Sequence, residues 1–78
     1  MNDEIDKSVG KSFVIASMQK YDIRQRESLY VRGIFPGKTI HLLQVSPLGD
    51  PLIVRVDTQK FAISRQMWAC FDFEEQCA

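Results

Sequence analysis

The sequence has no excess charge of either sign. Ten Lys and Arg balance ten Asp and Glu over 78 residues, so the formal net charge is zero. Nucleic-acid-binding domains of this size usually carry a basic excess, because neutralising phosphates supplies much of their affinity. We therefore expect no nucleic-acid partner, and we interpret the arginine-rich stretch from Lys20 to Arg32 as a solvated helix face.

Cysteines and long apolar runs are also scarce. Cys70 and Cys77 are the two cysteines, and they form neither a C-x-x-C pair nor a disulfide framework. No apolar run approaches the roughly 18–20 residues that a membrane helix needs. The acidic start from Met1 to Asp6 has no apolar segment behind it, as a secretory signal would have. The sequence thus predicts a cytoplasmic protein that is not inserted in a membrane.

Residue types that support catalysis or tight metal binding are few. The one histidine, His41, is expected to face solvent from a strand, and no serine lies in a nucleophile-elbow context. A tight metal site needs three or four converging ligands, and the spacing of His41, Cys70 and Cys77 does not bring them together. We therefore predict no enzyme, no catalytic residue and no assigned metal ligand. A weak surface site for Fe²⁺ or another divalent transition metal is left open.

What the sequence does contain is a series of short strand patterns. With 45% hydrophobic residues the chain has enough apolar material for one core. A chain this short cannot cover both faces of a flat sheet, so we predict a mainly β small barrel of about five strands. We expect residues 1–8 to be a flexible leader, 9–75 the domain and 76–78 a tail. Alternation and β-branched content place the strands at residues 11–18, 39–46, 52–56, 60–63 and 70–74.

One short α-helix is expected from Ile23 to Arg32. Asp22 can accept from the first-turn N–H groups, and Gln25 stands where a capping box requires it. Gly33 follows at the left-handed position that ends many helices. We expect Tyr30 to lie on the side packed against the barrel, with a role in recognition as the alternative.

Two further signals lie on either side of the middle strands. Pro36 presets one φ angle of a turn, and Gly37 supplies the positive φ that a type II turn needs. Near the end of the chain, Ser64 can cap a single helical turn over Arg65–Ala69, which places Trp68 against the barrel.

Residues 46–51 read Ser-Pro-Leu-Gly-Asp-Pro. Pro47, Gly49 and Pro51 predict a rigid turn that continues neither neighbouring strand. Leu48 lies at its tip, and two interpretations are open for it: contact with a partner or packing within the loop. Asp50 is expected to cap backbone N–H groups of its own loop, with partner contact as the alternative.

Two segments, in this order and at this distance, resemble those of a known family. The first is residues 29–37, Leu-Tyr-Val-Arg-Gly-Ile-Phe-Pro-Gly, and the second is the loop 46–51. The segments Phe61–Ile63 and Ala69–Phe73 also fit the family's closing strands. Over roughly residues 9–74, the chain resembles the ferrous iron transport protein A (FeoA) family.

The resemblance implies an SH3-like small barrel, in agreement with the strand count. It also implies a cytosolic accessory protein that contacts the membrane ferrous iron transporter at its GTPase region. The candidate contact residues are Leu48, Asp50 and Tyr30. The alternatives are a metal-sensing regulatory module, since the module also resembles a domain of iron-dependent repressors, and a nucleic-acid-binding barrel. Self-association into a homo-oligomer is left open.

Overall fold

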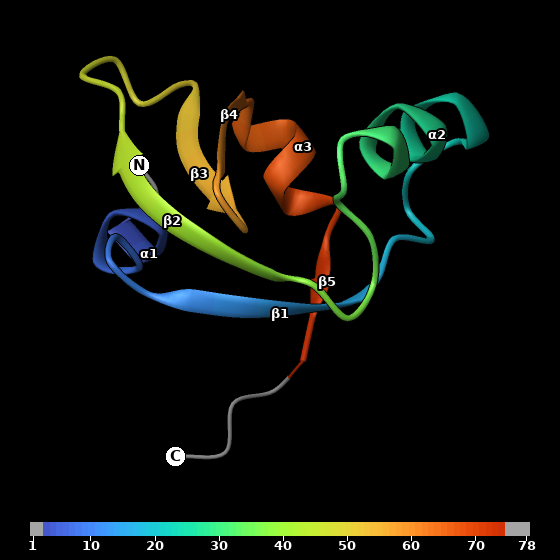
Figure 1. Ribbon diagram of the computed structural model, residues 1–78. Coiled ribbons are helices and arrows are strands. Elements are labelled where there is room, and N and C mark those ends of the chain that lie inside the picture. The colour runs from blue at the N-terminus through green and yellow to red at the C-terminus, as the bar shows by residue number, and fades with distance from the viewer. Residues whose placement is uncertain (1–2, 75–78) are drawn as a thin grey trace.

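The computed structural model describes residues 3–74, which form five strands and three short helices in one small domain (Figure 1). The mainly β class predicted from the sequence is confirmed. The elements follow the chain in the order α1 (Asp3–Lys7), β1 (Ser12–Ser17), α2 (Ile23–Val31), β2 (Thr39–Val45), β3 (Leu52–Val56), β4 (Gln59–Ile63), α3 (Arg65–Ala69) and β5 (Asp72–Phe73).

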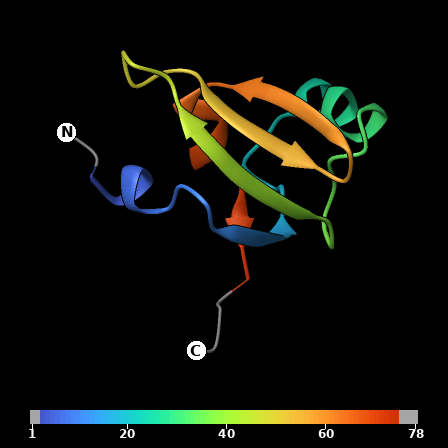
Figure 2. The same ribbon diagram turned by 60° about the vertical axis from the view of Figure 1, so that its left-hand side comes forward.

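The strands form one antiparallel sheet in the order β4-β3-β2-β1-β5. The sheet is curled rather than flat, and β5 crosses the end of β1 (Figures 1 and 2). In β2 the pairing with β3 shifts between Leu42 and Gln44, which marks a β-bulge or irregularity at Leu43. The closing strand is shorter than predicted, because Cys70 and Phe71 leave α3 before pairing with β1 begins at Asp72.

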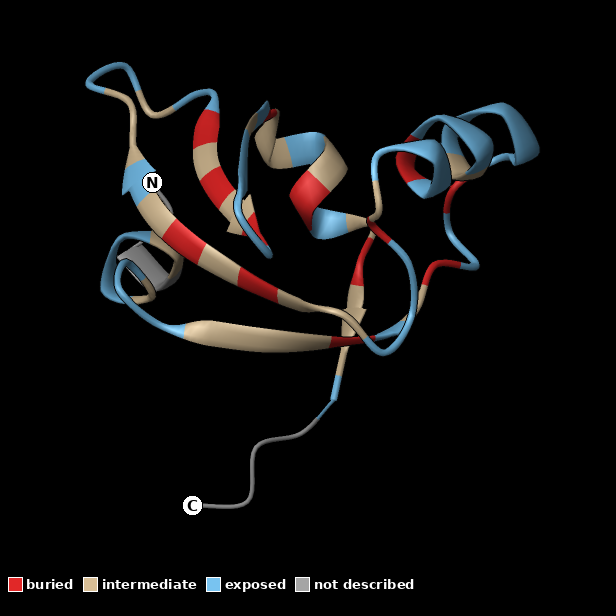
Figure 3. Cartoon of the chain, viewed as in Figure 1, coloured by how far each residue is buried: buried red, intermediate tan, exposed pale blue. Residues whose placement is uncertain are grey.

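The core lies inside the curl of the sheet, and buried segments recur along its strands (Figure 3). Ile40, Leu42 and Val54 are fully buried. Trp68 of α3 packs onto the core as predicted. Its ring centroid lies 5.5 Å from that of Phe13. The remaining buried side chains are Ile15, Met18, Tyr21, Leu29, Ile34, Leu52, Val56, Ile63 and Phe71.

Local signals position α2 as the sequence predicts. The Asp22 side chain accepts from the Gln25 N–H while the Gln25 side chain accepts from the Asp22 N–H, a complete capping box. At the other end, the Gly33 N–H donates to Tyr30 O and the Ile34 N–H to Leu29 O, both over 2.9 Å. These two bonds make a Schellman motif, and Gly33 has the positive φ of 88° that it requires.

The packed side of α2 differs from the expectation. Within the helix Leu29 is the buried residue, whereas Tyr30 is 45% exposed, so the prediction that Tyr30 packs against the barrel is wrong. Neighbouring residues of a helix point about 100° apart, so Tyr30 turns away from the core when Leu29 faces it. Tyr21 before the helix and Ile34 after it are each 1% exposed, and they fix the nine-residue helix at the end of the barrel.

The segment expected to be a flexible leader contains α1. Ile5 packs against the core, which holds this single turn in place. Just after it, Gly10 N–H donates to Leu42 O and Leu42 N–H to Lys11 O, which ties the segment to β2. Cys70 is only partly buried, and it packs at the edge of the core. Cys77 and the tail 76–78 lie outside the described residues.

Candidate functional site

The loop between β2 and β3, residues 46–51, projects from one end of the barrel (Figure 1). Two backbone bonds close it: Ser46 N–H donates to Pro51 O over 3.2 Å, and Gly49 N–H donates to Ser46 O over 2.7 Å. Gly49 has φ of 90°, a conformation that favours glycine. The loop therefore has a defined shape of its own.

Leu48 lies at the tip of this loop and is 96% exposed. The interpretation that Leu48 packs within the loop is therefore wrong. A single exposed apolar residue needs no functional explanation by itself. What distinguishes Leu48 is its position at the tip of a loop that backbone hydrogen bonds close.

Asp50 and Arg65 attach the loop to α3. Oδ1 of Asp50 accepts a hydrogen bond of 2.9 Å from the backbone N–H of Arg65, the first residue of α3. Asp50 was expected to cap its own loop, and it instead receives the N–H of an element 15 residues later in the chain. Nε of Arg65 also donates to the carbonyl oxygen of Gly49. The loop and α3 are thus joined by two hydrogen bonds.

An open pocket lies beside the loop, where α1, β2 and α3 meet it. Nη2 of Arg65 lies 3.9 Å from Oδ1 of Asp6, so one guanidinium contacts both α1 and the loop. The pair is exposed to solvent and contributes little stability, at most about 1 kcal/mol. The pocket is lined by Asp6, Val45, Ser46, Pro47, Leu48, Gly49 and Arg65.

Tyr30, the third predicted contact residue, lies on a different surface. Helix α2 is at the opposite end of the barrel from the loop 46–51 (Figure 1). The Tyr30 ring meets that of Phe35 edge to face, with 6.3 Å between centroids. Exposed apolar side chains surround it, and Val31 is 85% exposed. Leu48 and Asp50 thus lie on one loop, whereas Tyr30 lies at the other end of the barrel.

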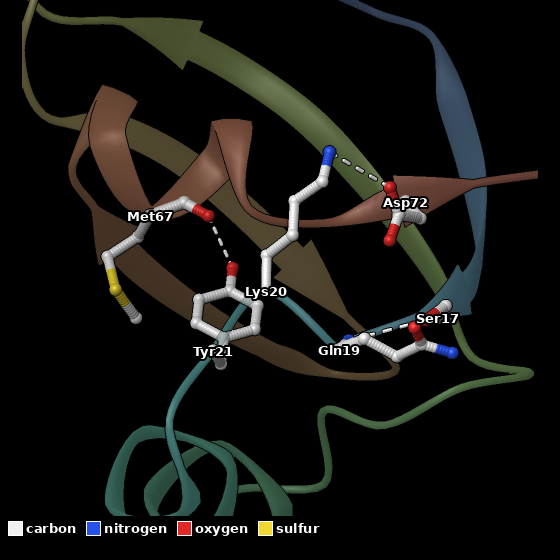
Figure 4. Close-up of polar contacts among 6 residues, drawn as sticks. All are labelled: Ser17, Gln19, Lys20, Tyr21, Met67 and Asp72. Carbon is white, nitrogen blue, oxygen red and sulfur yellow. Dashed lines mark hydrogen bonds and ion pairs between the residues drawn. The ribbon is translucent and has the colours of Figure 1, made fainter.

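Sequence reasoning did not single out Tyr21, which connects α2 to α3. The Tyr21 hydroxyl donates to the carbonyl oxygen of Met67 (Figure 4). Burial raises the pKa of the Tyr21 phenol above its ordinary value, and the neighbouring Cys70 adds to the rise. An aromatic residue directly before a helix cap is the sequence signal that could have indicated this role.

Beside Tyr21, two exposed contacts link the same region to β1 and β5. Nζ of Lys20 lies 3.1 Å from Oδ1 of Asp72, and Gln19 N–H donates to Ser17 Oγ over 3.3 Å (Figure 4). Both are solvent-accessible, so we assign them to local structure rather than to binding.

Within residues 3–74, no group of three or more His, Cys, Asp or Glu side chains is placed to hold a metal ion. His41 is half-buried, and its Nδ1 lies 2.6 Å from Ser12 Oγ. The same part of the chain contains no helix with the length and apolar character of a membrane span.

The FeoA domain family model matches residues 6–70. Among solved structures, iron(II) transport protein A from Clostridium thermocellum superposes with a TM-score of 0.77 at 24% identity, over 85% of this chain and 40% of that one. The FeoA protein from Chlorobium tepidum gives 0.77 at 22%, over 83% and 61%. A crystal structure of an iron uptake regulatory protein (FeoA) gives 0.72 at 21%, over 90% and 89%.

These structural matches establish the fold alone, because a sequence identity below 25% does not carry function from one protein to another. The chain spans less than two thirds of the first two proteins, so their full activities do not transfer with the fold. None of the curated proteins compared with the chain matches it.

Proposed function

This chain belongs to the FeoA domain family, and we propose that it is an accessory protein of bacterial ferrous iron transport that binds the cytosolic GTPase region of the membrane transporter. In this proposal the chain works in the cytoplasm and acts by contact, without a reaction of its own. Two of the structurally similar proteins are named for iron(II) transport and iron uptake, which supports the iron pathway.

The observation that carries the proposal is the 96% exposure of Leu48 on a loop fixed by Arg65. A rigid loop loses little conformational entropy when it binds, so more of the contact energy appears as affinity. Burying one leucine side chain in a partner pocket stabilises a complex by roughly 1.5–3 kcal/mol. Asp50 supports the contact indirectly, because it holds the loop against α3.

Tyr30 is proposed as a separate contact. Together with Ile23, Val31 and Phe35 it forms an exposed apolar surface on and beside α2. Because this surface lies at the other end of the barrel, its contribution can be measured independently of Leu48.

The test is capture of the detergent-solubilised ferrous iron transporter by the immobilised chain, with GTP, with GDP and without nucleotide. We compare the wild type with Leu48→Asp, and with Thr58→Asp as a control that adds the same charge at an exposed turn between β3 and β4. We expect capture by the wild type and Thr58→Asp and loss of capture by Leu48→Asp. A Tyr30→Ala variant reports on the second surface.

Absence of capture under all three nucleotide conditions, from a chain shown to be folded, would contradict the accessory function. Equal capture by Leu48→Asp and wild type would retain the function but remove the loop 46–51 from the interface.

A further inference from the structure

Three basic side chains lie next to one another across the strands β2, β3 and β4. Antiparallel pairing places His41 opposite Arg55 and Arg55 opposite Lys60. Directly paired residues point to the same face of a sheet, with strands about 5 Å apart. We call His41, Arg55 and Lys60 the basic row, and we propose that it binds a phosphate group, either as inorganic phosphate or as a phosphate ester.

The basic row lies on the outer face of the sheet. Side chains alternate between faces along a strand, and the neighbours Leu42 and Val54 are fully buried in the core. In Figure 2 the strands β2, β3 and β4 lie side by side, with α3 and α2 behind them. The outer face is therefore accessible to a ligand from solvent.

Neither Arg55 nor Lys60 belongs to any of the ion pairs within residues 3–74. The next outward carboxylate on the chain, Asp57, is bound to Lys38, with 2.7 Å between Oδ2 and Nζ. Arg55 and Lys60 carry like charges directly opposite one another, an arrangement that destabilises a sheet. A bound anion would remove this repulsion.

Arg55 is the central residue of the row, and its Nε is shielded from solvent without a hydrogen-bond partner. Nε of Arg26 on α2 is shielded in the same way, so this feature does not by itself mark a ligand site. The guanidinium fork matches the geometry of phosphate oxygens. Nε itself is closed to a ligand from solvent, so a phosphate on this face would meet the terminal nitrogens of the guanidinium.

His41 is oriented by a neighbour in β1. Ser12 pairs with His41 across β1 and β2, and its Oγ lies 2.6 Å from Nδ1. When the hydroxyl donates to Nδ1, the neutral ring carries its proton on Nε2 and can donate to a ligand. The row then presents donors on three adjacent strands.

The spacing favours phosphate over carboxylate. The outer members, His41 and Lys60, are two strand spacings or about 10 Å apart, and long side chains must converge on one group. A tetrahedral phosphate offers acceptors in several directions and two negative charges, whereas a carboxylate offers two oxygens in one plane and one charge.

The test is an NMR titration of the whole chain, following backbone and side-chain signals of the row. Inorganic phosphate is one probe and ribose 5-phosphate another, so that free phosphate and phosphate ester are distinguished. Sodium acetate and sodium chloride at matched ionic strength are the controls. We expect saturable shifts at His41, Arg55 and Lys60 with phosphate or its ester, and much weaker effects of the controls.

Variants locate the site. We expect Arg55→Gln to lower the affinity about tenfold or more, the loss of one charge-assisted hydrogen bond. Lys60→Gln, at an exposed position, should also weaken binding. This variant keeps the test available if Arg55→Gln proves unfolded. Lys11→Gln, an exposed lysine outside the row, should leave affinity unchanged. Equal shifts with acetate or chloride, no saturation with either phosphate probe, or unchanged affinity in Lys60→Gln would overturn the proposal.

Discussion

The backbone N–H of Arg65 donates a hydrogen bond of 2.9 Å to Oδ1 of Asp50, which joins the first turn of α3 to the loop between β2 and β3. The same arginine donates from Nε to Gly49 O, so the loop cannot move far without breaking both bonds. Because these bonds hold the loop against α3, they also hold the exposed Leu48 in one position. The rigidity of the loop is therefore a property that mutations can test.

Replacing Asp50 by Ala removes the acceptor for the Arg65 N–H. We expect the free energy of unfolding to fall by about 1 kcal/mol, the usual net value of one hydrogen bond. Urea denaturation followed by circular dichroism measures it. Asp72→Ala is the control, since its ion pair with Lys20 is exposed and contributes between about 0 and 1 kcal/mol. We also expect Asp50→Ala to weaken capture of the transporter, and unchanged stability together with unchanged capture would contradict the anchoring role.

Replacing Gly33 by Ala tests the end of α2. A Cβ at Gly33 meets no heavy atom within 4 Å, so the cost comes from the backbone φ of 88° alone. We expect a loss of roughly 1–2 kcal/mol in the free energy of unfolding. The control is Ser28→Ala, at an exposed position inside the same helix, which should be neutral or slightly stabilising. A Gly33→Ala variant as stable as wild type would show that this helix end can adopt another conformation.

The pH dependence of stability tests the burial of Tyr21. Its pKa is raised in the folded protein, so the native state favours the neutral phenol. The resulting stability is present below the unfolded pKa of about 10 and is lost as pH rises further through the folded pKa. We expect the wild type to lose stability steeply above pH 10, and Tyr21→Phe to lose less over the same interval. Parallel curves for the two proteins would contradict the assignment.

The parts of this fold that the sequence predicted depend on local signals. Alternating apolar residues placed the strands, and the Asp22 capping box with Gly33 placed α2. Local patterns do not say which side of a short helix is covered, and this is why Tyr30 was placed in the core. Helix α1 was missed for a similar reason, because its order depends on Ile5 reaching a core built by later residues.

In the candidate site, too, local signals were predictable from the sequence and tertiary contacts were not. Proline and glycine predicted a rigid turn with Leu48 at its tip, because their backbone preferences are intrinsic. The bond between Asp50 and Arg65 joins residues 15 positions apart and depends on how α3 docks. The basic row was also invisible from sequence, because strand register decides that His41, Arg55 and Lys60 are neighbours.

The most direct test of the proposed function follows the leucine methyl groups of the chain by NMR while the cytosolic GTPase region of the transporter is added. Leu48 is exposed, whereas Leu42 and Leu52 are buried in the core and Leu29 is the buried residue of α2. We expect the Leu48 methyl signals to shift and broaden first while those of Leu42 and Leu52 stay in place. We also expect Leu48→Asp to abolish binding while its stability stays within about 0.5 kcal/mol of wild type. Binding that leaves the Leu48 signals unchanged, or no binding by the folded wild type, would contradict the proposed contact.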